Sequence, residues 1–453
     1  MKLKRLCGFF AGVLLMGQAV FAQAQPAAPE TDQKQFPATL RQLELKDGDS
    51  IVLLGDSITH QRLYTQYVED FFYTRFPNKR LKIHNAGVGG ARALDAMDRF
   101  DRDVAAYQPK YVTILLGMND GTYRSYDEAT FQTYQQDMTK LLDRIAEIGA
   151  VAIPMTPTMF DTRALRLRSK DSKRIESTRL YNSVLAYYGG WLQEETYARG
   201  LGFVDMYSPL NQITYAERKK NSDFTLIPDA VHPGPDGHVI MAVAVIHDLG
   251  LAGPISLTQI VRGADGHWTG KDPKGKVQDV AGTAETVSFT LTARSLPWVL
   301  PADAQLGTRL TSLGHRCSRE ALQVAGLPAG KYLLTIDGTD IGTFTNVQLG
   351  QRIELQGNAK TPQHQQALKV AELNKQRNEG PIGQLRGEWL KFQRYARAKR
   401  NTTDSNAAAK LEPEMAQLDE RVAEFNARAK ELEDQIFEIN KPQPHKYELK
   451  PVQ

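Results

Sequence analysis

The chain has 453 residues, of which 41% are hydrophobic and 24% charged, a balance typical of globular rather than disordered or membrane proteins. This length leaves room for two or three domains of ordinary size. The formal net charge of +4 falls by three, to +1, when Lys2, Lys4 and Arg5 are left out. The remaining charge gives no electrostatic reason to expect a nucleic-acid partner.

The N-terminus has the three parts of a secretory signal. The basic residues at its start precede a largely apolar run over 6–21, and Ala22-Gln23-Ala24 forms a small-x-small cleavage site. The apolar run is short for a membrane span, and no later segment reaches the required length. We therefore expect residues 1–24 to be removed near Ala24. The mature protein would be exported, to the periplasm or the medium, and would begin with a linker over 25–48.

Residues 49–252 alternate between apolar strands and amphipathic helices. Strands are predicted at 51–54, 81–84, 111–116, 151–155 and 202–205. The helical stretches include 132–148, 179–199 and 238–249. This alternation predicts an α/β domain in which helices cover both faces of a parallel sheet.

A change of pattern follows in residues 253–358. Val287–Thr292 alternates strictly between apolar and polar side chains, 331–336 nearly does so, and 337–344 has the composition of a hairpin turn that leads into a strand. These features predict a small antiparallel β-domain.

From 361 to 440 the pattern is helical. Apolar residues recur there with heptad spacing, at Leu411, Met415, Leu418, Val422, Phe425, Ala429, Leu432, Ile436 and Ile439. Such a seam predicts a coiled coil or a helical hairpin packed against 363–399, and dimerisation through these helices is a second possible use of it. Residues 441–453 are interpreted as a tail.

Polar residues and glycines follow the strands of the α/β domain. "GDS" (55–57) follows the first strand, "NAGVGGAR" (85–92) the second and "LLGMNDG" (115–121) the third, and "DAVHPGPDGH" (229–238) comes after the last. The carboxyl ends of parallel strands share one edge of the sheet, so these stretches are expected to converge.

The residue types at this edge suit nucleophilic catalysis. Ser57 alone would equally be a helix cap, but a serine hydroxyl becomes a nucleophile when a base takes its proton, and His232 is the natural base. Asp229, three residues earlier, is placed to orient the imidazole. Backbone N–H groups of Ser57 and Gly90, with the Asn119 amide, are the candidate oxyanion hole.

In their order these stretches resemble the sequence blocks of the SGNH (GDSL) hydrolase family over residues 49–250. Ser57 matches the serine of the first block, Gly90 the glycine of the second, Asn119 the asparagine of the third and His232 the histidine of the last. The resemblance implies a flavodoxin-like α/β/α fold and ester hydrolysis through an acyl-enzyme, with no metal or other cofactor. Gly89 replaces a serine that the family usually has, which leaves Gly87 or Gly89 as alternative oxyanion glycines.

The resulting functional hypothesis is an exported serine esterase that acts on acylated carbohydrate, most simply on acetyl esters. Lipid esters or thioesters are alternative substrates. A carbohydrate-binding or cell-envelope scaffold with a vestigial hydrolase domain is the alternative from another class. The basic stretch 162–179 is either a clamp for an anionic substrate or a solvated helix face.

Overall fold

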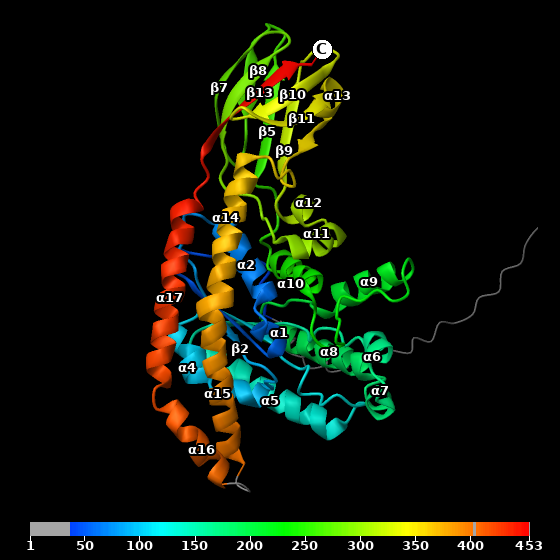
Figure 1. Ribbon diagram of the computed structural model, residues 1–453, viewed down its shortest axis with the longest axis vertical. Coiled ribbons are helices and arrows are strands. Elements are labelled where there is room, and N and C mark those ends of the chain that lie inside the picture. The colour runs from blue at the N-terminus through cyan, green and yellow to red at the C-terminus, as the bar shows by residue number, and fades with distance from the viewer. Residues whose placement is uncertain (1–36, 402–404, 453) are drawn as a thin grey trace, which may run out of the picture. The chain divides into compact units, whose positions relative to one another are not determined.

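The computed structural model describes residues 37–401 and 405–452 (Figure 1). The predicted signal peptide and the first part of the predicted linker lie outside these residues. The described part of the linker is not a free connection. Leu43 and Leu45 are buried in the core of the α/β domain, and the Leu43 N–H donates to the Leu249 carbonyl at 3.2 Å.

A parallel sheet forms the centre of the α/β domain. Its strands are β1 (Ser50–Gly55), β2 (Lys82–Gly87), β3 (Tyr111–Leu115) and β4 (Val151–Pro154), in the order β2-β1-β3-β4. An isolated parallel bridge between Met155 and Val204 adds the fifth predicted strand beside β4. This order is that of flavodoxin-like folds. The strands are buried along nearly their whole length, as their uninterrupted apolar sequences predicted.

Helices flank this sheet and complete the predicted α/β architecture. The longer ones are α2 (Leu63–Arg75), α5 (Glu128–Glu147), α8 (Tyr181–Arg199), α9 (Tyr207–Arg218) and α10 (Pro235–Asp248). The shorter ones are α1 (Ser57–His60), α3 (Ala93–Asp98), α4 (Phe100–Asp103), α6 (Thr162–Arg168) and α7 (Ser172–Ser177). Helix α2 contacts α10, whereas α5 and α8 contact β4.

The β-rich region consists of two sheets that share one hydrophobic core. Their strands are β5 (Ser256–Arg262), β6 (Trp268–Lys271), β7 (Lys276–Gly282), β8 (Val287–Thr292), β9 (Glu320–Ala325), β10 (Lys331–Ile336), β11 (Thr339–Thr345), β12 (Ile353–Glu354) and β13 (Pro444–Pro451). The strand orders are β11-β10-β13-β8-β7 and β12-β9-β5-β6. The pairs are antiparallel except β5 with β9, so the predicted antiparallel β-domain is confirmed, with one parallel pair in it. The short helices α11 (Gln305–Thr311), α12 (Leu313–Cys317) and α13 (Asn346–Gln351) lie between strands.

The interpretation of residues 441–453 as a tail was wrong. Strand β13 lies between β10 and β8 and buries Tyr447 and Leu449. These two apolar residues alternate with Lys446, Glu448 and Lys450, which is a strand pattern. Two apolar residues are too few to predict a strand, and the pairing partners that stabilise β13 are distant in sequence.

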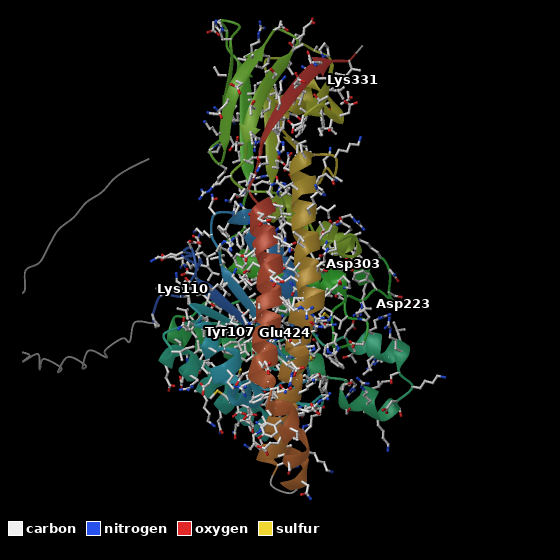
Figure 2. All side chains as sticks on the ribbon, turned by 60° about the vertical axis from the view of Figure 1, so that its left-hand side comes forward. Tyr107, Lys110, Asp223, Asp303, Lys331 and Glu424 are labelled. Atoms are coloured by element: carbon white, nitrogen blue, oxygen red, sulfur yellow. The ribbon has the colours of Figure 1, made fainter. Side chains whose placement is uncertain are left out.

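The C-terminal helices form an antiparallel hairpin, which we call the helical arm (residues 362–401 and 405–439). It contains α14 (Pro362–Arg377), a π-helical turn at Asn378–Ile382, α15 (Gly383–Arg400), α16 (Ser405–Met415) and α17 (Leu418–Ile439). Helix α17 returns alongside α15 and α14, as Figures 1 and 2 show. The predicted helical hairpin is confirmed, and its heptad seam packs within the chain. Dimerisation through it stays a prediction.

The helical arm is docked on the α/β domain through apolar and charged contacts. Leu385 and Trp389 of α15 belong to the same buried core as the central sheet. Arg377 pairs with Glu69 at 3.1 Å, and both side chains are buried. The chain from residue 37 onward forms one compact unit, so the boundaries predicted near 252 and 361 separate parts of one body rather than independent domains.

Candidate active site

Ser57 lies where the chain turns from β1 into α1. Asp56 caps this helix, because its Oδ1 accepts a hydrogen bond from the Ile58 N–H at 2.9 Å. Glycine is required at position 55, since a Cβ there would lie 2.1 Å from Thr59 Oγ1. The sharp turn that these residues build presents the Ser57 side chain, half-buried, at the carboxyl end of the first strand.

Ser57, His232 and Asp229 form one chain of hydrogen bonds. Ser57 Oγ lies 2.8 Å from His232 Nε2, and His232 Nδ1 lies 2.7 Å from Asp229 Oδ2. Asp229 Oδ1 also accepts from the backbone N–H groups of Val231 and His232, at 2.9 and 2.7 Å. Burial raises the pKa of the Asp229 carboxyl, but these hydrogen bonds outweigh burial and bring it below its ordinary value. The structure thus brings Ser57 into contact with a pair, Asp229 and His232, that lies 172 and 175 positions later in the sequence.

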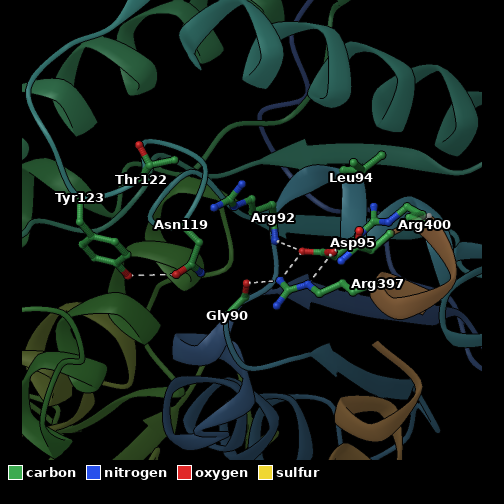
Figure 3. A pocket seen from close by; sticks show the side chains of 10 residues that line it. Gly90, Arg92, Leu94, Asp95, Asn119, Thr122, Tyr123, Arg397 and Arg400 are labelled. Carbon is green, nitrogen blue, oxygen red and sulfur yellow. Dashed lines mark hydrogen bonds and ion pairs between the residues drawn. The ribbon is translucent and has the colours of Figure 1, made fainter. Parts of the chain in front are cut away.

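Gly90 and Asn119 lie on neighbouring loops and line the same cavity of about 600 Å³ (Figure 3). Gly90 has φ +69°, in the left-handed region that favours glycine. Asn119 Nδ2 donates to the Ala91 carbonyl at 3.1 Å, and the Tyr123 hydroxyl donates to Asn119 Oδ1 at 3.0 Å. Within the described part of the chain, the Gly90 N–H has no hydrogen-bond acceptor.

The alternative glycine at position 87 has a different role. Its N–H donates to Asn85 Oδ1 at 2.9 Å and is therefore already used. A Cβ at this position would lie 2.4 Å from the His60 backbone nitrogen. Gly87 thus permits close packing of β2 against α1, and Gly90 stays the better candidate for an oxyanion donor.

Two buried carboxyl groups support the loops around Ser57. Asp120 Oδ1 accepts from the Ala93 N–H at 2.9 Å, and its Oδ2 accepts from the Gly117 N–H at 3.0 Å. Burial raises the pKa of Asp56 to about 7 and that of Asp120 to about 6. Both side chains bond backbone groups of turns and therefore support the loops rather than act on substrate.

The helical arm supplies part of the lining of this cavity, a contribution that the sequence did not predict. Besides Gly90 and Asn119, the cavity is lined by Arg92 and Asp95 of the α/β domain and by Arg397 and Arg400 of α15. Nothing in the sequence around Arg397 indicates an active site, because its partners lie some 300 residues earlier. Such a contact emerges only from the docking of the arm.

The basic stretch 162–179 forms α6 and α7 and the turns beside them. Arg163, Arg166 and Arg179 line a second cavity of about 450 Å³ together with Phe160. The Phe160 ring contacts that of Tyr123, which lines the first cavity, with 6.2 Å between centroids. Most residues of the stretch are exposed, and its cavity adjoins the one lined by Gly90 and Asn119.

Other histidines and acidic residues do not form a metal site in the part of the chain that the structure describes, where no group of three or more such ligands occurs. His238 is a buried packing residue. Its Nδ1 accepts from the Tyr64 N–H at 3.3 Å, and burial lowers its pKa to about 3. No helix among the described residues is both long and apolar enough to cross a membrane.

Residues 51–245 match the family of GDSL-like lipases and acylhydrolases. The chain is 23% identical over 230 residues to an acetylxylan esterase of Geobacillus stearothermophilus, which covers 46% of this chain and 97% of that protein. Among solved structures, a gut microbial diltiazem-metabolizing enzyme is 25% identical with a TM-score of 0.77, covering 91% of this chain and 100% of that one. A crystal structure of the acetylxylan esterase, at 23% identity, has a TM-score of 0.36 and covers 46% of this chain and 97% of its own.

The parallel α/β sheet and the family match together define an SGNH (GDSL) hydrolase domain over residues 51–245. The fold and family predicted from the sequence are thereby confirmed. The protein is a carboxylic ester hydrolase that acts on acyl esters.

Proposed function

We propose that the protein is an exported serine esterase that removes acyl groups, chiefly acetyl groups, from carbohydrate. The observation that carries this proposal is the unbroken hydrogen-bond chain from Ser57 through His232 to Asp229, at the sheet edge where the Gly90 and Asn119 loops meet. The similarity to an acetylxylan esterase supports acetyl esters of a polysaccharide as substrates. The signal-like pattern at the N-terminus supports export.

In the proposed mechanism, His232 Nε2 takes the proton of Ser57 Oγ as the oxygen attacks the ester carbonyl. His232 then gives that proton to the leaving alcohol, and water, activated by the same nitrogen, releases the acyl group from Ser57. Asp229 holds the imidazole through Nδ1 and stabilises its charged form. Its 2.7 Å contact is short enough for a charge-assisted hydrogen bond.

The oxyanion of the tetrahedral intermediate would be held by the N–H groups of Ser57 and Gly90 and by the Asn119 amide. An amide nitrogen carries two hydrogens. Asn119 can therefore hold the Ala91 carbonyl with one N–H and the oxyanion with the other. The Tyr123 hydroxyl, by donating to Asn119 Oδ1, keeps the amide from exchanging its oxygen and nitrogen.

The lining of the cavity favours a hydroxyl-rich substrate over a long acyl chain. Arg92, Asn119, Thr122 and Tyr123 supply polar groups, and Leu94 is its aliphatic member. A volume of about 600 Å³ is within the range of sites for small ligands or a few sugar units. Lipid substrates would call for a more apolar surface than this one.

Hydrolysis of p-nitrophenyl acetate and of a longer-chain ester, by the wild type and by Ser57→Ala, tests the proposal. We expect activity on the acetate that Ser57→Ala loses, and release of acetate from acetylated xylo-oligosaccharides. Preference for the longer ester would favour a lipase. Carbohydrate binding that survives in Ser57→Ala, with a wild type that hydrolyses nothing, would favour the scaffold alternative. An N-terminus at Gln25 in protein recovered from the periplasm or medium would support export.

A further inference from the structure

The turn that carries Gly90 is held by two side chains of α15 in the helical arm. Gln393 Nε2 donates to the Gly89 carbonyl at 2.9 Å. Arg397 Nη2 donates to the Gly90 carbonyl at 2.7 Å (Figure 3). Two consecutive peptide carbonyls of this turn are therefore bound by residues that lie some 300 positions later in the chain.

The planarity of the peptide bond makes the first of these contacts important. The Gly89 carbonyl and the Gly90 N–H belong to the same trans peptide group, so they point in opposite directions. A donor fixed on the Gly89 oxygen therefore fixes the direction of the Gly90 N–H. That N–H is the proposed oxyanion donor, and no described residue accepts a hydrogen bond from it.

A Gly-Gly turn needs such an external restraint. Glycine reaches both positive and negative φ easily, so the peptide between Gly89 and Gly90 has several accessible orientations. Gly90 has φ +69°, and a Cβ on Gly90 would meet nothing within 4 Å. The side chains around this turn thus do not confine Gly90 by contact. Near Gly89, the atom that a Cβ would meet is Leu390 Cδ1 at 3.8 Å, again on α15.

Both donors are themselves held in place. Gln393 is 2% exposed, so the surrounding atoms restrict the rotation of its side chain. Arg397 binds Asp95 through Nε at 2.9 Å and Nη2 at 2.5 Å, and Asp95 also accepts from the Arg92 N–H at 2.9 Å. Burial raises the pKa of Asp95, but the bonds from Arg397 and the Arg92 backbone outweigh it, so the pKa lies below its ordinary value. The carboxylate that anchors Arg397 is therefore ionised at neutral pH.

We propose that Gln393 and Arg397 are positioning residues of the esterase: through the Gly89 and Gly90 carbonyls they aim the Gly90 N–H at the oxyanion. The helical arm is then a functional part of the active site. This inference rests on the proposed function, in which Gly90 is an oxyanion donor.

Gln393→Leu in the full-length protein tests the inference, because it removes the donor and keeps the approximate volume. Removal of a whole oxyanion donor costs about 10²- to 10³-fold in kcat. In Gln393→Leu the Gly90 N–H is present but misdirected part of the time. We therefore expect kcat for p-nitrophenyl acetate to fall about 10- to 100-fold, with KM within about twofold of the wild type. Gln384→Leu, the same change at an exposed position of α15, is the matched control and should leave kcat unchanged.

Gln393→Glu provides a readout that a packing role would not move. An ionised glutamate cannot donate to the Gly89 carbonyl, whereas a protonated one can donate through its O–H. The ratio of its kcat to that of the wild type should therefore rise as the pH is lowered. Thermal unfolding shows whether Gln393→Leu folds. If it does not, the pH dependence of the Gln393→Glu to wild-type kcat ratio still tests the inference.

The outcomes separate this inference from the proposed function. Activity in Ser57→Ala equal to that of the wild type would overturn the proposed function, and this inference with it. Loss of activity in Ser57→Ala, with a folded Gln393→Leu whose kcat stays within twofold, would overturn the inference alone. A ratio of Gln393→Glu to wild-type kcat that does not vary with pH would also overturn it.

Discussion

Replacing Arg386 by methionine should destabilise the protein strongly, because it breaks a buried ion pair between the helical arm and the α/β domain. Arg386 of α15 donates through Nη1 and Nη2 to the two oxygens of Asp103, at 2.9 and 2.8 Å. Both side chains are 0% exposed. Asp103 also accepts from His84 Nε2 at 2.9 Å and lies 3.8 Å from Arg99 Nε.

The expected loss of unfolding free energy depends on which buried charges lose their partner in each variant. Removing one partner of a buried pair costs about 3–5 kcal/mol, since the other charge stays uncompensated. After Arg386→Met, Asp103 keeps Arg99 and His84 as partners, so we expect the lower end, about 3 kcal/mol. After Asp103→Asn, two buried arginines lose their carboxylate, so the loss should be about 5 kcal/mol or more.

Urea unfolding, followed by circular dichroism, measures both losses as changes in the free energy of unfolding. Arg386→Met should keep kcat within about twofold at a temperature where it is folded, since Arg386 does not touch the turn of Gly90. A loss below about 1 kcal/mol for Arg386→Met would refute the reasoning. So would a smaller loss for Asp103→Asn than for Arg386→Met.

Three further predictions concern the site itself. Burial raises the pKa of Asp56 to about 7. Between pH 4 and 7 this carboxyl is therefore protonated in the folded protein but ionised in the unfolded chain. The free energy of unfolding consequently falls as the pH rises through this range. Asn does not titrate, so Asp56→Asn should remove up to about 4 kcal/mol of the fall in unfolding free energy between pH 4 and 8. Plots of unfolding free energy against pH that run parallel for the variant and the wild type would contradict this. Asp229→Asn should lower kcat up to about 10⁴-fold with little change in KM, because His232 loses the partner that fixes its tautomer and ring orientation; an unchanged kcat in the ester assay would disprove that role. Gly87→Ala should cost about 3 kcal/mol or more in urea unfolding because its Cβ would lie 2.4 Å from a backbone nitrogen, whereas Gly190→Ala, with open space around its Cβ, should not destabilise α8.

The α/β domain was predictable because its signals are local. Ile51–Leu54 is apolar without interruption, which is typical of a strand covered on both faces, and this strand is buried. The spacing of Asp229 and His232 places both on one short loop, where they bond each other. Convergence with Ser57 followed from the rule that the carboxyl ends of parallel strands meet at one edge.

The contacts of the helical arm could not be predicted in this way. Gln393 and Arg397 lie in a helix whose sequence shows which face is apolar, but not which loop that face will meet. Strand β13 shows the same limit, because its pairing with β8 and β10 depends on partners more than 100 residues away. Each such contact depends on two segments that are distant in sequence, so the sequence of one segment alone does not predict it.

The helical arm and the hydrolase domain are physically inseparable, although the family match ends at residue 245. Removing the arm would leave Asp103 and Glu69 without Arg386 and Arg377, and would expose the core against which Trp389 packs. It would also release the Gly89 and Gly90 carbonyls from α15. Stability and the geometry of the turn at Gly90 therefore depend on the same helix, so substitutions in α15 must be tested for both.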